Sequence, residues 1–169
     1  MKMHPLAALL LFFTLLQCSP PPKPDVPTLT TTETAIRQVV LDLFQAMYDG
    51  DSSRAHDLFQ TDAKLYTIYL RNDSTQFHRG EVSQFLTAIG TAHEFKWIEK
   101  SWNYKISVDG GLGQVWCDYA FFAGDSFSHC GVDAFQLVHT TEGWRIFSLA
   151  DTRRKEACIF PTGAYFEPK

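Results

Sequence analysis

The sequence lacks a hydrophobic run of the roughly 20 residues that a membrane-spanning helix needs. It also lacks a run of basic residues, and its net charge of −4 makes nucleic acid a poor partner. Charged residues make up only 20% and hydrophobic residues 45%, a balance that excludes intrinsic disorder and a coiled coil. No GxSxG, P-loop, GxGxxG, HExxH or EF-hand pattern occurs. We therefore expect no cofactor and no resident metal ion.

Cysteine is scarce as well, with 4 residues and no CxxC pair. Beyond Cys18 there remain Cys117, Cys130 and Cys158, whose spacing matches no zinc site. Three cysteines allow at most one internal disulfide. They are therefore apolar core residues, one disulfide with a free thiol, or a site with a reactive thiol.

The N-terminus carries a short apolar segment at residues 6–16 after the basic Lys2. This arrangement is typical of an export signal. Cys18 follows the apolar segment and precedes a Pro-rich stretch, a pattern that resembles a bacterial lipoprotein signal. The resemblance implies acylation of Cys18 and attachment to the cell envelope, in the periplasm or at the outer membrane. Ordinary secretion and an uncleaved anchor are the alternatives.

The domain boundaries follow from these features. We predict a signal peptide over residues 1–17, a tether over 18–31, one folded domain over 32–160 and a tail over 161–169. About 130 residues suffice for one hydrophobic core and are too few for two ordinary domains.

Helical periodicity dominates the start of the domain. Apolar residues at helical spacing predict a helix over 32–49, begun by a capping box from Thr30 to Glu33 and ended by Gly50. A second short helix is expected from the Asp51 cap to Phe59, and a third over 81–89.

The period changes to two from residue 95 onwards. A strand is expected at 64–70, and long strands joined by tight turns follow at 101–108, 114–122, 127–140 and 144–152. Helices followed by a run of antiparallel strands predict an α+β fold.

Asp49-Gly50-Asp51 follows the first predicted helix, Asp62-Ala63 precedes the first predicted strand, and Gly143-Trp144-Arg145 begins the last one. In this order the motifs resemble the nuclear transport factor 2-like superfamily. The resemblance is closest to the SnoaL-like and lumazine-binding-like branches. It implies a cone-shaped, strongly curved, antiparallel-rich sheet wrapped around three N-terminal helices, a cystatin-like roll with a deep pocket. It does not specify a function, because this fold hosts both enzymes and binding proteins.

The hairpin at Gly124-Asp125 sets an expected register in which paired residues of its two strands sum to 249. That register places Asp118, His129 and Asp133 on one face. The same face would carry Trp116 and Phe135, continued by Trp144, Ile146, Ser148 and Ala150. The opposite face would carry Tyr119, Phe121, Val132, Ala134 and Val138, and we expect a homodimer through it.

Three ionisable side chains among aromatic residues need partners or a purpose. Asp118, His129 and Asp133 are thus candidate catalytic residues, with one Asp keeping His129 charged and the other retaining its proton. They are equally candidates for ligand binding or for a structural network. Trp116, Phe135, Trp97 and Tyr104 are expected to hold the apolar body of a ligand.

Arg153 lies at the end of the last strand. It is expected either to pair with Asp151, to attract an anionic ligand at the pocket mouth, or to be solvated. The leading hypothesis is an exported domain that binds a small, mostly apolar molecule. A cofactor-independent lyase, isomerase or hydrolase and a non-catalytic interaction module of the cell envelope are the alternatives.

Overall fold

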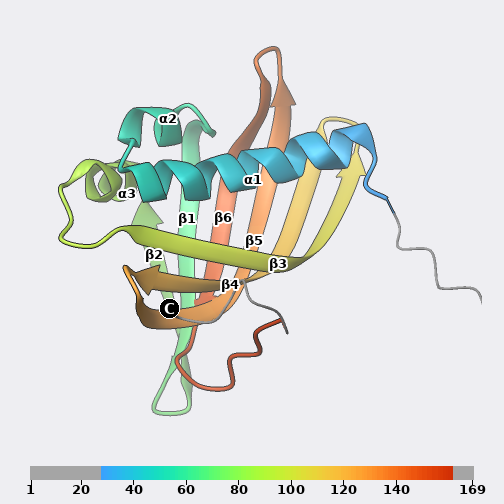
Figure 1. The fold of residues 1–169 in the computed structure, drawn as a ribbon. Helices are drawn as coiled ribbons and strands as arrows, with labels where there is room; N and C mark the ends of the chain where they lie inside the picture. The colour runs from blue at the N-terminus through green and yellow to red at the C-terminus, as the bar shows by residue number, and fades with distance from the viewer. Residues whose placement is uncertain (1–27, 162–169) are drawn as a thin grey trace, which may run out of the picture.

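The computed structural model describes residues 28–161, so the predicted signal and Cys18 lie outside the described residues. These described residues form three helices and six strands (Figure 1). The helices are α1 (Thr31–Asp49), α2 (Ser52–His56) and α3 (Val82–Gly90). The strands are β1 (Phe59–Arg71), β2 (Ser74–Glu81), β3 (Trp97–Asp109), β4 (Leu112–Ala123), β5 (Ser126–Thr140) and β6 (Gly143–Arg153). No helix among the described residues is long and apolar enough to span a membrane.

One curved sheet holds all six strands in the order β2-β1-β6-β5-β4-β3. The pair β1–β6 is parallel and the other pairs are antiparallel. The sheet does not close, and α1 lies across its concave side (Figure 1). The α+β prediction with N-terminal helices and a strongly curved sheet is confirmed.

The long helix α1 begins and ends as its sequence predicts. Thr30 accepts a hydrogen bond from the backbone of Glu33, whose carboxylate accepts one from the backbone of Thr30. Gly50 ends the helix in the left-handed conformation, with φ of 73°. The predicted second helix is shorter than expected, because Phe59 already starts β1. The strand β2 was not predicted.

The core lies between α1 and the concave face of the sheet, which we call the inner face. Its fully buried members on the helix include Ile36, Val40 and Leu43. From the sheet they contact Val115, Cys117, Phe135, Leu137 and Ile146.

A smaller apolar cluster lies on the opposite side of the sheet, the outer face. It contains Ala120, Phe122 and Cys130, packed against Trp102 and Cys158. The chain after β6 therefore crosses the outer face and shields part of it from solvent.

Bulges decide which residues face the core. The β4–β5 register shifts between Phe121 and Phe122, where Ser128 is an extra residue in β5. Asp118 consequently lies opposite Val132, and Cys117 lies opposite Asp133. The predicted register is wrong by one residue over most of this pair, which moves every β4 side chain to the other face relative to β5.

Two further bulges change which residues share a face of the sheet. The β3–β4 register shifts between Trp102 and Lys105, next to Asn103 with φ of 52°. The β5–β6 register shifts between Gln136 and Leu137, so that Leu149 rather than Ser148 lies opposite Phe135. Ser148 and Ala150 therefore do not continue the face of Phe135.

Candidate functional site

A cavity of about 410 Å³ opens on the inner face between α1, α3 and the sheet. We call it the inner cavity. Its apolar wall includes Leu43, Phe44, Met47, Phe85, Trp97 and Phe121. Its polar wall includes Glu99, Tyr119, His129, Asp133, Asp151 and Arg153.

A second hollow of about 840 Å³ lies between the β1–β2 hairpin, α3 and the end of β6. We call it the outer groove because it lies outside the inner cavity; the name does not refer to the outer face of the sheet. Its lining includes Tyr66, Tyr69, His78, Arg154 and Lys155. The two hollows have residues in common, namely Phe85, His129, Leu149, Asp151 and Arg153. They are therefore contiguous, with Arg153 and His129 on their shared wall.

The predicted trio of Asp118, His129 and Asp133 is not assembled. His129 and Asp133 line the inner cavity, but the bulge at Phe121 and Phe122 puts Asp118 on the outer face. There the Asp118 carboxylate accepts a hydrogen bond from the side chain of Asn103 at 2.7 Å.

The carboxyl that joins Asp133 is that of Glu99, on β3. The two side chains share a hydrogen bond, and the Oδ2 atom of Asp133 accepts no hydrogen bond from the described residues. Asp133 is only 3% exposed. Burial, followed by the repulsion of Glu99, raises the pKa of Asp133 well above its ordinary value. As predicted, a pocket carboxyl holds its proton.

The pKa of Glu99 is also raised, and burial is again the largest cause. Burial raises its pKa to about 7, the hydrogen bond from Asp133 opposes the rise, and the charge of Asp151 adds to it. The two carboxyls titrate as a pair. Asp133 in its protonated form donates to Glu99, so its carboxyl can make further hydrogen bonds only as an acceptor.

The pKa of His129 is lowered, which is opposite to the prediction. Burial, then the positive charges of Arg153 and Lys155, lower its pKa to about 4, although Asp151 opposes this shift. The expectation that an Asp would keep the imidazole charged is wrong, since desolvation and two cations outweigh one carboxylate. Its ring lies against that of Phe121, with centroids 5.3 Å apart, and its Nδ1 atom is 3.0 Å from the Ser128 hydroxyl.

Asp151 is the centre of a polar network on the shared wall. It accepts hydrogen bonds from the hydroxyl of Thr67 at 2.6 Å and of Tyr119 at 3.2 Å. The Nε atom of Arg153 donates to it at 2.6 Å. The pairing of Asp151 with Arg153, one of the three alternatives for Arg153, is thus confirmed.

The predicted ligand-contacting residues lie in different places. Trp97 and Arg153 line the inner cavity. Phe135 is fully buried behind the cavity wall, with its ring against Phe44. Tyr104 lies under the guanidinium of Arg37, and Trp116 is exposed on the outer face, opposite Ala134. Neither Tyr104 nor Trp116 is part of the cavity lining.

Sequence reasoning missed Glu99 and Tyr119. A signal for Glu99 was present, because it follows Trp97 by two residues and strand alternation puts both on one face. Tyr119 was assigned, with Phe121, to the outer face. Both residues line the inner cavity instead, which corrects the predicted dimer surface.

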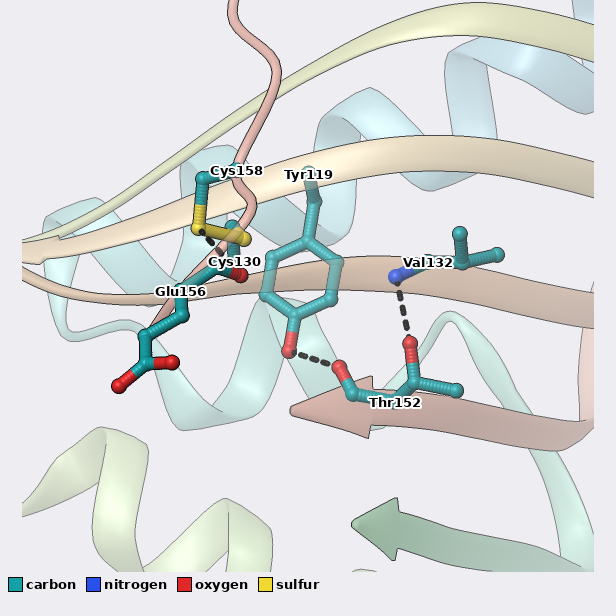
Figure 2. The surroundings of a disulfide bond; sticks show 6 residues. All are labelled: Tyr119, Cys130, Val132, Thr152, Glu156 and Cys158. Atoms are coloured by element: carbon teal, nitrogen blue, oxygen red, sulfur yellow. Dashed lines mark hydrogen bonds between the residues drawn. A yellow bond between two sulfur atoms is a disulfide. The ribbon is translucent and has the colours of Figure 1, made fainter. Parts of the chain in front are cut away.

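A disulfide joins Cys130 of β5 to Cys158 in the chain after β6 (Figure 2). Cys117 is a free, buried thiol. Burial raises the pKa of the Cys117 thiol, so it remains protonated and is a poor nucleophile. The cysteines thus follow the alternative of one disulfide with a free thiol. Within residues 28–161, no group of three or more His, Cys, Asp and Glu side chains is placed to hold a metal ion.

The profile of one protein family, described as "Putative lumazine-binding", matches residues 31–150. The chain belongs to this family. The matched region runs from α1 into β6 and includes Glu99 and Asp133 of the carboxyl pair, whereas Asp151 and Arg153 lie just beyond its end. A comparison with curated proteins found no match.

Solved structures of nuclear transport factor 2-like proteins share the fold. One from Novosphingobium aromaticivorans, with a cystatin-like fold, has a TM-score of 0.59 at 13% identity, covering 75% of this chain and 84% of its own. One from Streptomyces avermitilis, described as a "putative dehydratase", has a TM-score of 0.59 at 19% identity, covering 74% and 97%. One from Shewanella baltica has a TM-score of 0.56 at 16% identity, covering 76% and 99%. At these identities the similarity shows the superfamily fold alone.

Proposed function

We propose that this protein is an exported domain that binds a small, mostly apolar molecule in the inner cavity. The observation that carries the proposal is the buried carboxyl of Asp133, whose Oδ2 atom accepts no hydrogen bond from the described residues and which lines a cavity whose other wall is apolar and aromatic. Leaving a buried polar atom without a partner costs about 1–3 kcal/mol. A ligand that donates a hydrogen bond to this atom recovers that free energy. The family description, which names binding of a small heterocycle, supports the proposal.

The carboxyl pair defines the polar group of the ligand. Because protonated Asp133 donates its O–H to a hydrogen bond with Glu99, its carboxyl can only accept a hydrogen bond from a ligand. The ligand therefore presents an O–H or N–H group to Asp133 and packs its apolar body against residues such as Trp97 and Phe121.

Native mass spectrometry of the protein purified from its own host tests this proposal. We expect a retained small molecule that is released on unfolding. Asp133→Asn offers both the donor for Glu99 and an acceptor for the ligand, so it should retain the molecule. Asp133→Leu removes both and should lose it. Asp118→Asn, on the outer face, is the matched control. Equal retention by Asp133→Leu would contradict the proposal.

Proton-transfer catalysis is the second candidate, favoured by the pKa of about 7 of Glu99. A carboxyl that titrates near neutral pH beside an apolar cavity is suited to general acid–base catalysis. Once a substrate is known, Glu99→Gln should lower kcat by about 10²–10⁴ and largely preserve binding. A binding protein would show no turnover in either form.

Export and lipid anchoring are proposed from residues 6–16 and Cys18. The disulfide between Cys130 and Cys158 supports an oxidising compartment. Fractionation of cells expressing wild type and Cys18→Ala tests the anchor. Wild type should require detergent for extraction and the variant should not.

Homodimerisation is proposed through the outer face around Trp116, Val132 and Ala134. Trp116 is 44% exposed, which is high for so large an apolar side chain on a strand. Trp116→Glu should place an unpaired charge in that interface and yield a monomer. Sedimentation of wild type and of Arg71→Gln, a control at the β1–β2 turn, should give a dimer at micromolar concentration.

A further inference from the structure

The outer groove continues the inner cavity past the wall that carries His129, Asp151 and Arg153. The two parts differ in chemistry. The inner cavity is closed by apolar and aromatic side chains, whereas the outer groove ends at three consecutive basic residues, Arg153, Arg154 and Lys155. A molecule bound in both would meet an apolar environment at one end and positive charge at the other.

The positive charge at the groove is available to a ligand. Arg153 is held by Asp151 through its Nε atom, and within the described part of the chain its two Nη groups make no hydrogen bond or ion pair. Arg154 and Lys155 form no ion pair with any described residue and are exposed. The guanidinium of Arg153 is thus oriented by one edge while its other edge is free to bind an anion.

Two acidic residues also line the groove, Asp151 and Glu81. The charge of Asp151 is already matched by Arg153 and by the hydroxyls of Thr67 and Tyr119. Glu81 is exposed and lies opposite Lys64 in the β1–β2 register. Neither carboxylate cancels the charge of Arg154 and Lys155. The depressed pKa of His129 agrees with this balance, because Arg153 and Lys155 both contribute to it.

We propose that the ligand is an amphiphilic acid, with its apolar body and a hydrogen-bond donor in the inner cavity and its anionic group in the outer groove on Arg153 and Lys155. This inference rests on the proposed binding function and adds the class of ligand. Asp133 would hold the donor end, as argued above. The basic residues would hold a carboxylate or a phosphate, which share a pair of anionic oxygens that can accept two parallel hydrogen bonds from a guanidinium.

The strand geometry gives the scale of the distance between the two ends of the site. Asp133 and Asp151 are directly opposite one another on neighbouring strands, and Arg153 lies two residues further along β6. With strands about 4.8 Å apart and a rise of about 3.3 Å per residue, the backbones of Asp133 and Arg153 are roughly 8 Å apart. An aromatic ring with a short side chain spans this distance.

Three matched probes test the inference by isothermal titration calorimetry at neutral pH. They are para-hydroxyphenylpropanoate, its methyl ester, and phenylpropanoate. The first carries both end groups, the second lacks the anion, and the third lacks the donor. We expect the first to bind at least about tenfold more tightly than the ester, and added salt to weaken the acid and leave the ester unchanged.

Variants of the groove separate its contribution from that of the cavity. Lys155→Gln should reduce the preference for the acid over the ester severalfold, with unchanged affinity for the ester. Lys105→Gln, on the outer face, should leave both affinities unchanged. A phosphate monoester of hydroxyphenylethanol tests whether the groove prefers a phosphate or a carboxylate. The tighter binder of this compound and para-hydroxyphenylpropanoate identifies the preferred anionic group.

Equal affinity for acid and ester would overturn the inference and leave the proposed function intact. Failure of all three probes to bind would also overturn it. The proposed function is judged separately, by the molecule retained in native mass spectrometry and its loss in Asp133→Leu.

Discussion

The ring of Tyr119 crosses from β4 to β6, where its hydroxyl donates a hydrogen bond to the backbone carbonyl of Thr152 at 2.9 Å (Figure 2). On the strand between them, Gly131 lies directly opposite Tyr119. The Thr152 hydroxyl in turn accepts a hydrogen bond from the backbone of Val132 at 2.9 Å. These contacts hold the end of β6, and hence Arg153, against the cavity wall.

Gly131 is predicted to tolerate no side chain. A Cβ atom there would lie 1.7 Å from the carbonyl oxygen of Thr152 and 2.7 Å from the Tyr119 ring. Gly131→Ala should therefore lower the free energy of unfolding by about 3 kcal/mol or more, measured by urea denaturation. Gly111→Ala is the control, since nothing lies within 4 Å of its added Cβ. Similar stability of the two variants would show that the close approach is wrong.

Glu99 should make the protein less stable as pH rises. Its pKa is about 7 in the folded state against an ordinary value of 4.5, so the folded state binds more protons between these two pH values. The contribution of Glu99 is therefore fully present below pH 4.5 and is lost by about pH 7. Glu99→Gln should reduce this loss by an amount on the order of 3 kcal/mol. Urea unfolding at a series of pH values measures it, and an unchanged slope in the variant would contradict the assignment.

His129 should make the protein more stable as pH rises from about 4 to 6.5, which is opposite to the effect of Glu99. Its pKa is about 4 in the folded state against an ordinary value of 6.5, so the unfolded state binds more protons in this window. Its contribution is present above pH 6.5 and is lost as pH falls to about 4. His129→Gln should remove this gain, so that stability falls more steeply with rising pH than in wild type. The double variant with Glu99→Gln should be flatter than His129→Gln alone.

The disulfide between Cys130 and Cys158 should stabilise the fold by fixing the chain after β6 over the outer face. The bond spans 28 residues, and loops of this size correspond to about 2–4 kcal/mol. Cys158→Ser should lower Tm accordingly, and reductant should lower the Tm of wild type to the same value. Reductant should have no effect on the Cys158→Ser variant. A Tm of wild type that is insensitive to complete reduction, verified by thiol titration, would refute this contribution.

The elements that local chemistry controls could be predicted from the sequence. The capping box of Thr30 and Glu33 and the stop at Gly50 bound α1 as expected, because each depends on residues within one turn of helix. The turn at Gly124-Asp125 joined its two strands as expected, since a left-handed glycine suits a tight hairpin. Two residues of the cavity, His129 and Asp133, were likewise predicted from β5 alone.

The partners of Asp133 could not be predicted in the same way. A single bulge at Ser128 put Cys117 instead of Trp116 opposite Asp133, moved Asp118 to the outer face, and brought Tyr119 and Phe121 into the cavity. Local sequence gives no strong signal for this bulge. It accommodates the bend of the sheet around α1, a constraint that exists only once helix and sheet have packed together.

The sequence by itself determined the α+β plan, the extent of most elements and the presence of acidic and aromatic residues in a pocket, because periodicity and capping act over a few residues. Only the tertiary structure decided that Glu99 is the partner of Asp133, that His129 is neutral and that Arg153 lies on a wall shared by two hollows. These depend on strand register and on burial, which are properties of the whole sheet and not of any one segment.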